Sequence, residues 1–314
     1  MNKEDLSAAV RQLCQEKNAI IMAHYYTRPE IQDVADFIGD SLALAQQATR
    51  VDADIIVMCG VHFMGETMKI LCPEKKVLVP DLTAGCSLAD SCRAEDLEKF
   101  IAEHADEKPL VVSYVNTSAA VKALTDVVVT SSNAKHIVDQ LPQDAKIIFG
   151  PDKNLGNYIN SVTGREMILW DGACHVHSRF SLEALLALKK QYPDAPVLAH
   201  PECKALILTQ ADKIGSTKAL LEYTKTSSAE RFIIVTESGI LHEMQKACPD
   251  KEFIPVPPET TESIGCHCNE CEYMRLNTLE KLYACLKDEA PEIEVDAQIA
   301  KKAVLPIQRM LEMS

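Results

Sequence analysis

The chain has 314 residues, of which 47% are hydrophobic and 25% charged, and its formal net charge is −14. This composition is typical of a globular protein with sizeable cores and excludes a largely disordered chain. The negative balance argues against a nucleic-acid interface, which needs clustered lysine and arginine. The net charge does not exclude binding of small anionic ligands, because local backbone dipoles bind them even in an acidic protein.

The N-terminal segment, MNKEDLSAAVRQLCQEKN, has no apolar stretch of the signal-peptide kind. Leu6, Val10 and Leu13 in it fit one face of a helix in water. No window of the chain approaches the length of a membrane span. We therefore expect a cytoplasmic protein without a membrane partner, whose 12 cysteines are reduced thiols or metal ligands rather than disulfides.

Three stretches of the chain share one layout. Each begins with an apolar strand that ends in polar residues, at 19–26, 110–116 and 197–202. A helical stretch follows, and then a second apolar strand that runs into a turn and a helix, at 54–71, 126–141 and 232–247. A third short strand carries proline: KVLVPD, KIIFGPD and EFIPVPP. Strands of continuous Ile and Val that alternate with helices favour parallel sheets covered on both faces.

This repeat predicts an α/β fold of three similar αβα sandwich units with parallel sheets, arranged about a pseudo-threefold axis. We expect the first unit in residues 1–86 together with the C-terminal helices of 272–314, the second in 87–172 and the third in 173–271. The alternative is one large doubly wound sheet whose parts resemble each other by accident. In parallel α/β sheets, ligands bind beyond the carboxyl ends of the strands.

Cysteines stand after each of the three repeated stretches. Cys86 and Cys174 follow glycine-containing turns, and the tail carries Cys266, Cys268 and Cys271 in a C-x-C-x-x-C pattern. Thiolates from three distant segments suit an iron–sulfur cluster. Three thiolates on a four-iron cluster leave one iron open, and an open iron is a Lewis acid that assists dehydration. Spacing alone does not choose among the three tail cysteines.

Other interpretations of the cysteines stay open. A separate structural zinc on the tail, held together with His267, is one of them. Most of the other cysteines lie in apolar helix or strand patterns and are interpreted as small buried hydrophobes. They are Cys14, Cys59, Cys72, Cys248 and Cys285. Cys92 and Cys203 are left unassigned.

Polar residues end the first strand of each unit. They are His24, Tyr25 and Tyr26 in the first, Tyr114 and Asn116 in the second, and His200 and Glu202 in the third. If the units surround an axis, these side chains converge on one pocket. His and Glu are suitable general acids and bases there, and Tyr can donate to a developing oxyanion.

Ser and Thr recur where strands turn into helices. The segments are 39–41, 130–133, 215–217 and 236–239. Free backbone N–H groups at such turns bind carboxylate or phosphate, although the same residues also serve as ordinary N-caps. His175 and His177 flank Cys174 and are interpreted mainly as holding its turn.

The motifs MAHYY, VADFIGDSLALA, VLVPDLTAGCSLAD, VVSYVNTSAAVKA, VVTSSNA, FGPDKNLG, LWDGACHVHSRF, AHPEC, IGST, IIVTESGILHEM and CEYMRLNTLEKLY together resemble those of the quinolinate synthase family. The resemblance covers essentially the whole chain. It implies three α/β units about a pseudo-threefold axis with one [4Fe–4S] cluster at the centre. It also implies the cluster ligands Cys86, Cys174 and Cys271, the last of which directly precedes the EYMRL segment.

The resemblance further implies a transferase of NAD biosynthesis. Such an enzyme condenses iminoaspartate (iminosuccinate) with dihydroxyacetone phosphate to quinolinate, with loss of phosphate and two waters. L-aspartate oxidase or aspartate dehydrogenase would supply the iminoaspartate. The implied substrate-binding positions are His24, Ser41, Tyr114, Val115, Asn116, Ser131, His200, Pro201, Glu202, Ser216 and Thr217. We expect Tyr26, Tyr114, His200 and Glu202 to be catalytic.

Two departures from the family pattern are visible. The family often has AHNYQ where this chain has AHYYT, so that Tyr25 and Thr27 replace Asn and Gln. The tail is C-x-C-x-x-C instead of the C-x2-C-x2-C of many members, which puts a role of Cys266 and Cys268 in question but not that of Cys271.

Two rival functions remain. One is another iron–sulfur hydro-lyase that acts on a different dicarboxylic acid, and the other is a non-enzymatic iron–sulfur sensor. A sensor normally needs an output surface such as a basic DNA-reading helix, which this acidic sequence does not show.

Overall fold

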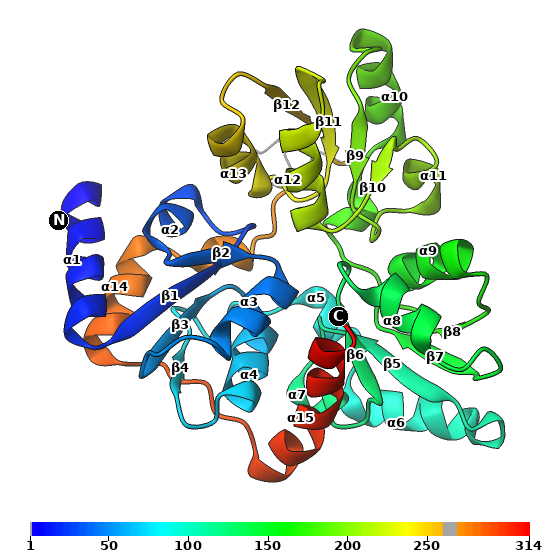
Figure 1. The fold of residues 1–314 in the computed structure, drawn as a ribbon, viewed down its shortest axis with the longest axis horizontal. Coiled ribbons are helices and arrows are strands. Elements are labelled where there is room, and N and C mark those ends of the chain that lie inside the picture. Colours follow the sequence, from blue (N-terminus) through cyan, green and yellow to red (C-terminus); the bar gives the residue numbers. More distant parts are fainter. Residues whose placement is uncertain (1, 260–268) are drawn as a thin grey trace.

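The protein is described by a computed structural model that covers residues 2–259 and 269–314. Three four-stranded sheets surround a common centre (Figure 1), and all their strand pairs are parallel. The first sheet, in the order β2-β1-β3-β4, contains β1 (Ala19–His24), β2 (Phe37–Gly39), β3 (Ile55–Cys59) and β4 (Lys76–Leu78). The second, β6-β5-β7-β8, contains β5 (Leu110–Tyr114), β6 (Val127–Val129), β7 (Ile147–Gly150) and β8 (Ile168–Leu169). The third, β10-β9-β11-β12, contains β9 (Val197–Ala199), β10 (Lys213–Ile214), β11 (Arg231–Val235) and β12 (Glu252–Pro255).

The three sheets have the same strand order, which confirms the prediction of three similar α/β units with parallel sheets. The alternative of one large doubly wound sheet is wrong, because no strand pair of the described residues joins two of the three sheets. The pseudo-threefold axis and the residue boundaries of the units stay predictions.

Helices cover the faces of the sheets. In the first unit they are α1 (Lys3–Glu16), α2 (Pro29–Val34), α3 (Ser41–Ala48) and α4 (His62–Leu71). Next in the chain come α5 (Ser87–Asp90), α6 (Ala94–Glu103), the short 3-10 helix η1 (Ala105–Glu107), α7 (Ala119–Lys122), α8 (Ala134–Gln140) and α9 (Lys153–Thr163). Around the third sheet are η2 (His177–Arg179), α10 (Leu182–Gln191), α11 (Ala205–Leu208), α12 (Thr217–Thr226) and α13 (Ile240–Ala247). The chain ends with η3 (Met274–Leu276), α14 (Leu279–Asp288) and α15 (Ala297–Glu312). Within the part of the chain that is described, no helix has the length and apolar character needed to cross a membrane.

The alignment of the second unit with the other two that the sequence pattern predicted is wrong by one strand. The sequence pattern equated 126–141 with 54–71 and 232–247, but β6 lies at the edge beside β5, where β2 and β10 lie in their sheets. The true counterpart of β3 and β11 is β7. The physical reason is burial, since α15 packs on β6 and makes this edge strand fully buried, whereas β2 and β10 are half-exposed. A buried edge strand has the same continuous apolar run as a central one.

An aspartate marks the equivalent edge strand in every unit. Its Oδ2 accepts the N–H of a residue in the first strand, and its own N–H donates back to the carbonyl of that residue. The pairs are Asp36 with Ile21 (2.7 Å), Asp126 with Val111 (2.8 Å) and Asp212 with Val197 (2.8 Å), each 15 residues apart. This spacing is a repeat signal that the sequence analysis missed, and it gives the correct alignment of the three units.

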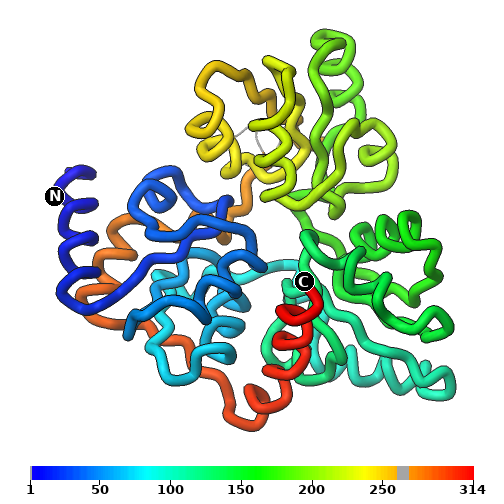
Figure 2. The backbone as a smooth tube through the Cα atoms, in the orientation of Figure 1, coloured from blue at the N-terminus to red at the C-terminus, as the bar shows by residue number. Residues whose placement is uncertain are grey.

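The last two helices connect the units. Figure 2 shows the chain leaving the third unit, running beside α1 and ending near the centre of the molecule. α14 packs against α1, and α15 contacts α4 of the first unit as well as α7 and β6 of the second. One buried cluster contains residues of all three sheets, among them Met22, Val112 and Ile234. The three units therefore share a continuous core, which fixes their strand ends relative to one another.

Candidate functional site

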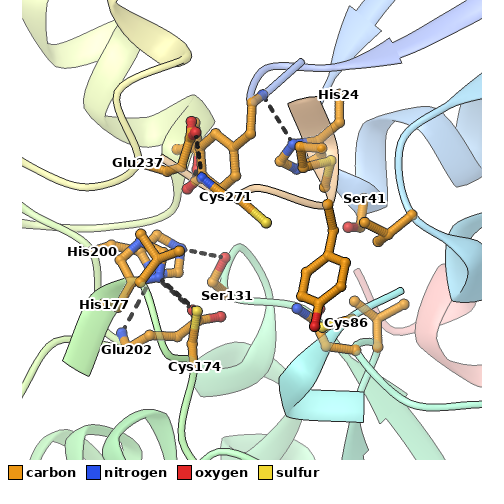
Figure 3. Close-up of a pocket in the computed structure, with 18 of the residues that line it drawn as sticks. His24, Ser41, Cys86, Ser131, Cys174, His177, His200, Glu202, Glu237 and Cys271 are labelled. Atoms are coloured by element: carbon orange, nitrogen blue, oxygen red, sulfur yellow. Dashed lines mark hydrogen bonds and ion pairs between the residues drawn. The ribbon is translucent and has the colours of Figure 1, made fainter. Parts of the chain in front are cut away.

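A pocket of about 740 Å³, its mouth included, lies where the carboxyl ends of the three sheets meet (Figure 3). Most of the residues predicted for the site line it. They are His24, Tyr26, Ser41, Cys86, Tyr114, Val115, Asn116, Ser131, Cys174, His200, Glu202, Thr217 and Cys271. Pro201 is buried directly beside His200, and Ser216 caps α12, where its Oγ accepts the N–H of Ala219.

The three predicted cysteine ligands share one local geometry. Each precedes a single helical turn, closed by a hydrogen bond from the N–H of the fourth residue onward to the cysteine carbonyl. The pairs are Asp90 to Cys86 (2.9 Å), Ser178 to Cys174 (2.9 Å) and Arg275 to Cys271 (3.2 Å). This turn points backbone N–H groups at each sulfur, from Leu88 and Ala89, from His177, and from Tyr273 and Met274.

Burial and the backbone N–H groups shift the pKa of these three thiols in opposite directions. It raises the pKa of Cys86 to about 11 and that of Cys271 to about 12, and it raises the pKa of Cys174 well above its usual value. The backbone N–H groups lower the pKa in each case and would stabilise a thiolate. The N–H groups thus offset part of the cost that burial places on a thiolate at these three positions.

Two buried acidic side chains hold the cysteine loops that follow the second and third sheets. Oδ2 of Asp152 accepts the N–H of Cys174 at 2.9 Å, and Oε1 of Glu237 accepts the N–H of Cys271 at 3.0 Å. Burial raises the pKa of Asp152 to about 7 and that of Glu237 to about 8. Asp152 was not predicted as a site residue, and Glu237 was named only as part of the 236–239 turn. With the corrected alignment they stand at one position, two residues after the third strand of their sheets, which is the signal that would have found them.

His24 and His200 are neutral rings with a defined tautomer. The N–H of Tyr26 donates to Nδ1 of His24 at 3.2 Å, and the N–H of Glu202 donates to Nδ1 of His200 at 3.3 Å. Burial lowers the pKa of His24 to about 4 and that of His200 to about 3. An Nδ1 that accepts leaves the proton on Nε2, and the Nε2–H of His200 donates to Oγ of Ser131 at 3.2 Å. Both rings therefore offer an N–H donor to the pocket.

A continuous hydrogen-bond chain joins two of the predicted catalytic residues. It runs from Glu202 Oε2 to His177 Nδ1 (2.7 Å), from His177 Nε2 to Thr236 Oγ1 (3.0 Å), from Thr236 Oγ1 to Tyr26 Oη (2.9 Å) and from Tyr26 Oη to Thr217 Oγ1 (2.6 Å). All five residues are buried. From the sequence, His177 was interpreted mainly as holding the turn, and Thr236 was named only as part of the 236–239 strand-to-helix turn. Such a chain can carry a proton between Glu202 and Tyr26.

Glu202 is the ionised end of this chain. Burial opposes its charge, but His177, His200 and Tyr114 together outweigh burial and hold the pKa of Glu202 below its usual value. The pKa of Tyr26 is raised well above its ordinary value, mainly by burial. The pKa of Tyr114 is raised in the same way. The chain thus connects a carboxylate that accepts protons with a phenol that keeps its proton at neutral pH.

Cys174, His177 and Glu202 also present three ligand atoms within 4.8 Å of one another. Nδ1 of His177 lies 2.7 Å from Glu202 and 3.3 Å from the Cys174 sulfur. Two nitrogen or oxygen ligands of one tetrahedral zinc ion stand roughly 3.3 Å apart. The shorter separation between His177 and Glu202 is that of a hydrogen bond, so these groups are arranged for proton transfer.

The remaining cysteines are placed in different surroundings. Cys92 and Cys203, left unassigned from the sequence, pack in hydrophobic cores. Of the described cysteines, only the three predicted ligands line the pocket. Cys266, Cys268 and His267 lie outside the described residues.

Three hydroxyl groups occupy equivalent positions after the edge strands. Ser41 and Thr217 are the first residues of α3 and α12, and Ser131 stands just before α8. Asp40 caps α3, where its Oδ1 accepts the N–H of Ala43 at 3.0 Å. All three hydroxyl-bearing residues line the pocket. Helix starts of this kind bind carboxylate and phosphate through free N–H groups.

Comparisons with known proteins agree on one family. Residues 8–312 match the family model described as "Quinolinate synthetase A protein". The chain is 55% identical to quinolinate synthase from Microcystis aeruginosa over 311 residues, which cover 99% of this chain and 96% of the relative. It is 55% identical to that of Chloroherpeton thalassium over 314 residues (100% and 96%) and 56% identical to that of Thermosynechococcus vestitus over 310 residues (99% and 96%).

Proposed function

Because the chain belongs to the quinolinate synthetase A protein family, we propose that it is a quinolinate synthase of de novo NAD biosynthesis. It condenses iminoaspartate (iminosuccinate) with dihydroxyacetone phosphate and releases phosphate and two waters. L-aspartate oxidase or aspartate dehydrogenase supplies the iminoaspartate. The observation that carries this proposal is one pocket, at the ends of three sheets, that combines three thiols, a proton relay and hydroxyl-bearing helix starts.

The proposed cofactor is one [4Fe–4S] cluster per chain, with Cys86, Cys174 and Cys271 as its ligands. The donor set fits, because soft sulfur atoms select such clusters and the three cysteines share one turn that aims N–H groups at sulfur. When bound, a cluster with three protein thiolates supplies a Lewis-acidic iron that assists loss of a hydroxyl group. The number of buried free thiols supports a reducing, cytoplasmic location.

Substrate binding falls to the polar strand and helix ends. Hydroxyl groups of Ser41, Ser131 and Thr217 hold carboxylate and phosphate oxygens, together with backbone N–H groups at the starts of α3 and α12. The Nε2–H of His24 donates to a substrate oxygen, whereas that of His200 donates to Oγ of Ser131 and orients this hydroxyl group toward the substrate. The predicted binding positions Val115 and Asn116 line the pocket, and Pro201 and Ser216 lie beside lining residues in the same strand-end loops.

Proton transfer falls to the buried chain of hydrogen bonds. Formation of the carbon–carbon bond releases a proton, which Glu202 Oε2 accepts because it is ionised. Tyr26 Oη donates its proton to a leaving hydroxyl and is then reprotonated through Thr236 and His177 by the proton that Glu202 took up. Tyr114, the last residue of β5, donates a hydrogen bond to a developing oxyanion. General acid–base groups of this kind contribute about 10²- to 10⁴-fold to a rate.

Product analysis tests the proposal. The protein is purified without oxygen and supplied with iminoaspartate and dihydroxyacetone phosphate, and the products are identified by mass spectrometry. We expect quinolinate and one phosphate for each dihydroxyacetone phosphate consumed. Dehydration of another dicarboxylic acid without quinolinate would identify the hydro-lyase rival. A fully iron-loaded protein that turns over neither would point to the sensor.

A further inference from the structure

Lys122, at the end of α7, is a fully buried lysine behind the pocket wall. Its Nζ donates to the carbonyl of Val115 at 2.9 Å and also to the carbonyl of Thr117. These two carbonyls flank Asn116, one of the predicted substrate-binding residues. Lys122 therefore holds the loop that follows β5 in place from behind.

Gln32 performs the same task in the first unit. Its Nε2 donates to the carbonyls of Tyr25 and Thr27, both at 2.9 Å, which flank Tyr26. In both units the donor stands seven residues after the first carbonyl and five after the second. Since the neutral amide of Gln32 makes the same hydrogen bonds as the ammonium of Lys122, positioning alone does not require a charge.

The charge of Lys122 is not balanced nearby. Its two acceptors are neutral carbonyls, and no carboxylate of residues 2–259 or 269–314 pairs with it within 4.0 Å. Glu66 and the Cys86 sulfur act on it from a greater distance, and Oε2 of Glu66 is occupied by the N–H of Ala119 at 3.0 Å. Burial lowers the pKa of Lys122 to about 8, which leaves it charged at neutral pH. A buried cation of this kind is costly unless some anion compensates it.

The pocket lies one side chain away from this ammonium. Nζ of Lys122 is 5.3 Å from the centroid of the Phe63 ring, and both Phe63 and Val115 line the pocket. None of the described residues that line the pocket is a lysine or an arginine, whereas Asp40, Glu202 and Glu237 are among them. A ligand with several negative charges would therefore meet no direct cationic side chain in this lining.

We propose that Lys122 is a positioning residue whose ammonium also supplies, through the wall of Phe63 and Val115, the positive potential that binds the anionic ligand. This inference rests on the proposed function, because iminoaspartate, dihydroxyacetone phosphate and quinolinate all carry carboxylate or phosphate groups. Two opposite charges separated by one side chain in a partly buried site contribute about ten-fold in affinity. The hydrogen bonds to the loop contribute separately, by fixing Asn116.

The repeat provides the variant that separates charge from hydrogen bonding. Lys122→Gln places at this position the residue that the first unit uses, so that it keeps donors for the two carbonyls and removes only the charge. The probes are quinolinate, which is a dianion, and pyridine-2,3-dicarboxamide, which is its neutral analogue. Kd values are measured by calorimetry on the anaerobic holoenzyme, with iron content and circular dichroism as checks of integrity.

We expect Lys122→Gln to weaken quinolinate binding about ten-fold and to leave the Kd of the dicarboxamide within about two-fold. Lys122→Met, which also loses the hydrogen bonds, should weaken both ligands. Unchanged quinolinate affinity in Lys122→Gln, or an equal loss for both ligands, would overturn the proposal. If wild-type protein fails to bind or form quinolinate, the proposed function fails instead, so the two failures are distinguishable.

If Lys122→Gln does not fold, the reciprocal variant Gln32→Lys tests whether a buried positive charge at this position changes the affinity for quinolinate. Three carbonyls surround Nε2 of Gln32, since Gly239 accepts from it at 3.1 Å, and Oε1 of Gln32 has no hydrogen-bond partner among the described residues. An ammonium with its three donors fits this position. We expect Gln32→Lys to tighten quinolinate binding several-fold, and an unchanged or weaker affinity would contradict the role of charge.

Discussion

The cysteine loop of the first unit is held differently from those of the second and third. In the latter two, the carboxylates of Asp152 and Glu237 accept the cysteine N–H. The equivalent residue of the first unit is Val61, which also stands two residues after the third strand of its sheet. In the first unit a main-chain hydrogen bond holds the loop instead: the N–H of His62 donates to the carbonyl of Ala84 at 2.7 Å.

This difference shows which features of the fold are fixed by the backbone. The sheets, the aspartate that locks each edge strand and the turn at each cysteine are the same in all three units. The side chains at the strand ends are free to differ, since they contribute polarity and proton transfer rather than shape. A repeated backbone can therefore deliver three equivalent sulfur atoms to a pocket whose remaining chemistry is asymmetric.

The largest expected effect is loss of the cluster. If each unit contributes one ligand, Cys86→Ser, Cys174→Ser and Cys271→Ser should each lose essentially all cluster absorbance and most of the iron, because a three-thiolate site has no spare ligand. Cys14→Ser is the control, since Cys14 is half-buried in α1 and packs in the separate core beneath that helix. Cys266→Ser and Cys268→Ser should also keep the iron.

Iron and acid-labile sulfide per chain are the measurement. Loss of iron in only two of the three variants would break the equivalence of the units, and full retention in Cys174→Ser would refute ligation by all three.

The proton relay crosses from the third unit to the first, and its removal should have the next largest effect. Tyr26→Phe deletes the hydroxyl between Thr236 and Thr217. We expect kcat to fall about 10²-fold or more with little change in the affinity for quinolinate. Tyr25→Phe is the matched control, because Tyr25 is the adjacent residue and packs in the core. An equal loss in the two variants would show that packing, not proton transfer, is at stake.

The cysteine loops that Asp152 and Glu237 hold should be sensitive to substitution of these two side chains. The loop before Cys86 is held by the main chain and has no such side chain to replace. Asp152→Asn and Glu237→Gln place an amide that can donate beside a cysteine N–H, and an unsatisfied buried N–H costs about 1–3 kcal/mol. We expect faster release of iron to a chelator and a shift of the cluster reduction potential.

Asp212→Asn provides the control for that experiment. It disturbs the same type of bond, to the N–H of Val197 in β9, at a site that does not hold a cysteine. It should lower thermal stability and leave the potential unchanged. A shift of the potential in this variant as well would mean that general loosening explains the effect.

The remaining expected effect concerns the pH dependence of stability rather than the cluster or the rate. His24 has a pKa of about 4 in the folded chain because it is buried, against about 6.5 when unfolded. Between these values only the unfolded chain takes up the proton, so the stabilisation is complete above pH 6.5 and is lost as the pH falls toward 4. The loss is about 3 kcal/mol.

Urea unfolding of cluster-free protein at pH 7 and pH 4.5 checks this. His24→Gln should lose less stability on acidification than the wild type, whereas His136→Gln, at an exposed position of α8, should behave as the wild type does. Equal losses in all three proteins would show that His24 does not cause the loss of stability at low pH.

The sequence was sufficient for the sheets and for most of the pocket, because strand ends of parallel units converge by topology. His24, Tyr114 and His200 could be placed together from the repeat alone. The alignment of β6 failed because α15, far along the chain, buries an edge strand, and such long-range packing leaves no local pattern. Asp152 and Glu237 were missed with it, and His177 could not be linked to Tyr26 before the third and first units were seen in contact.

If the loops after the three sheets each contribute one thiolate, one iron of the cluster stays open to the substrate. The most direct measurement is the Mössbauer spectrum of protein loaded with 57Fe, recorded with and without quinolinate. The account predicts that about one quarter of the iron signal changes when quinolinate is added, and that the rest stays the same. A cluster in which all the iron is unaffected by quinolinate, with full loading, would contradict it.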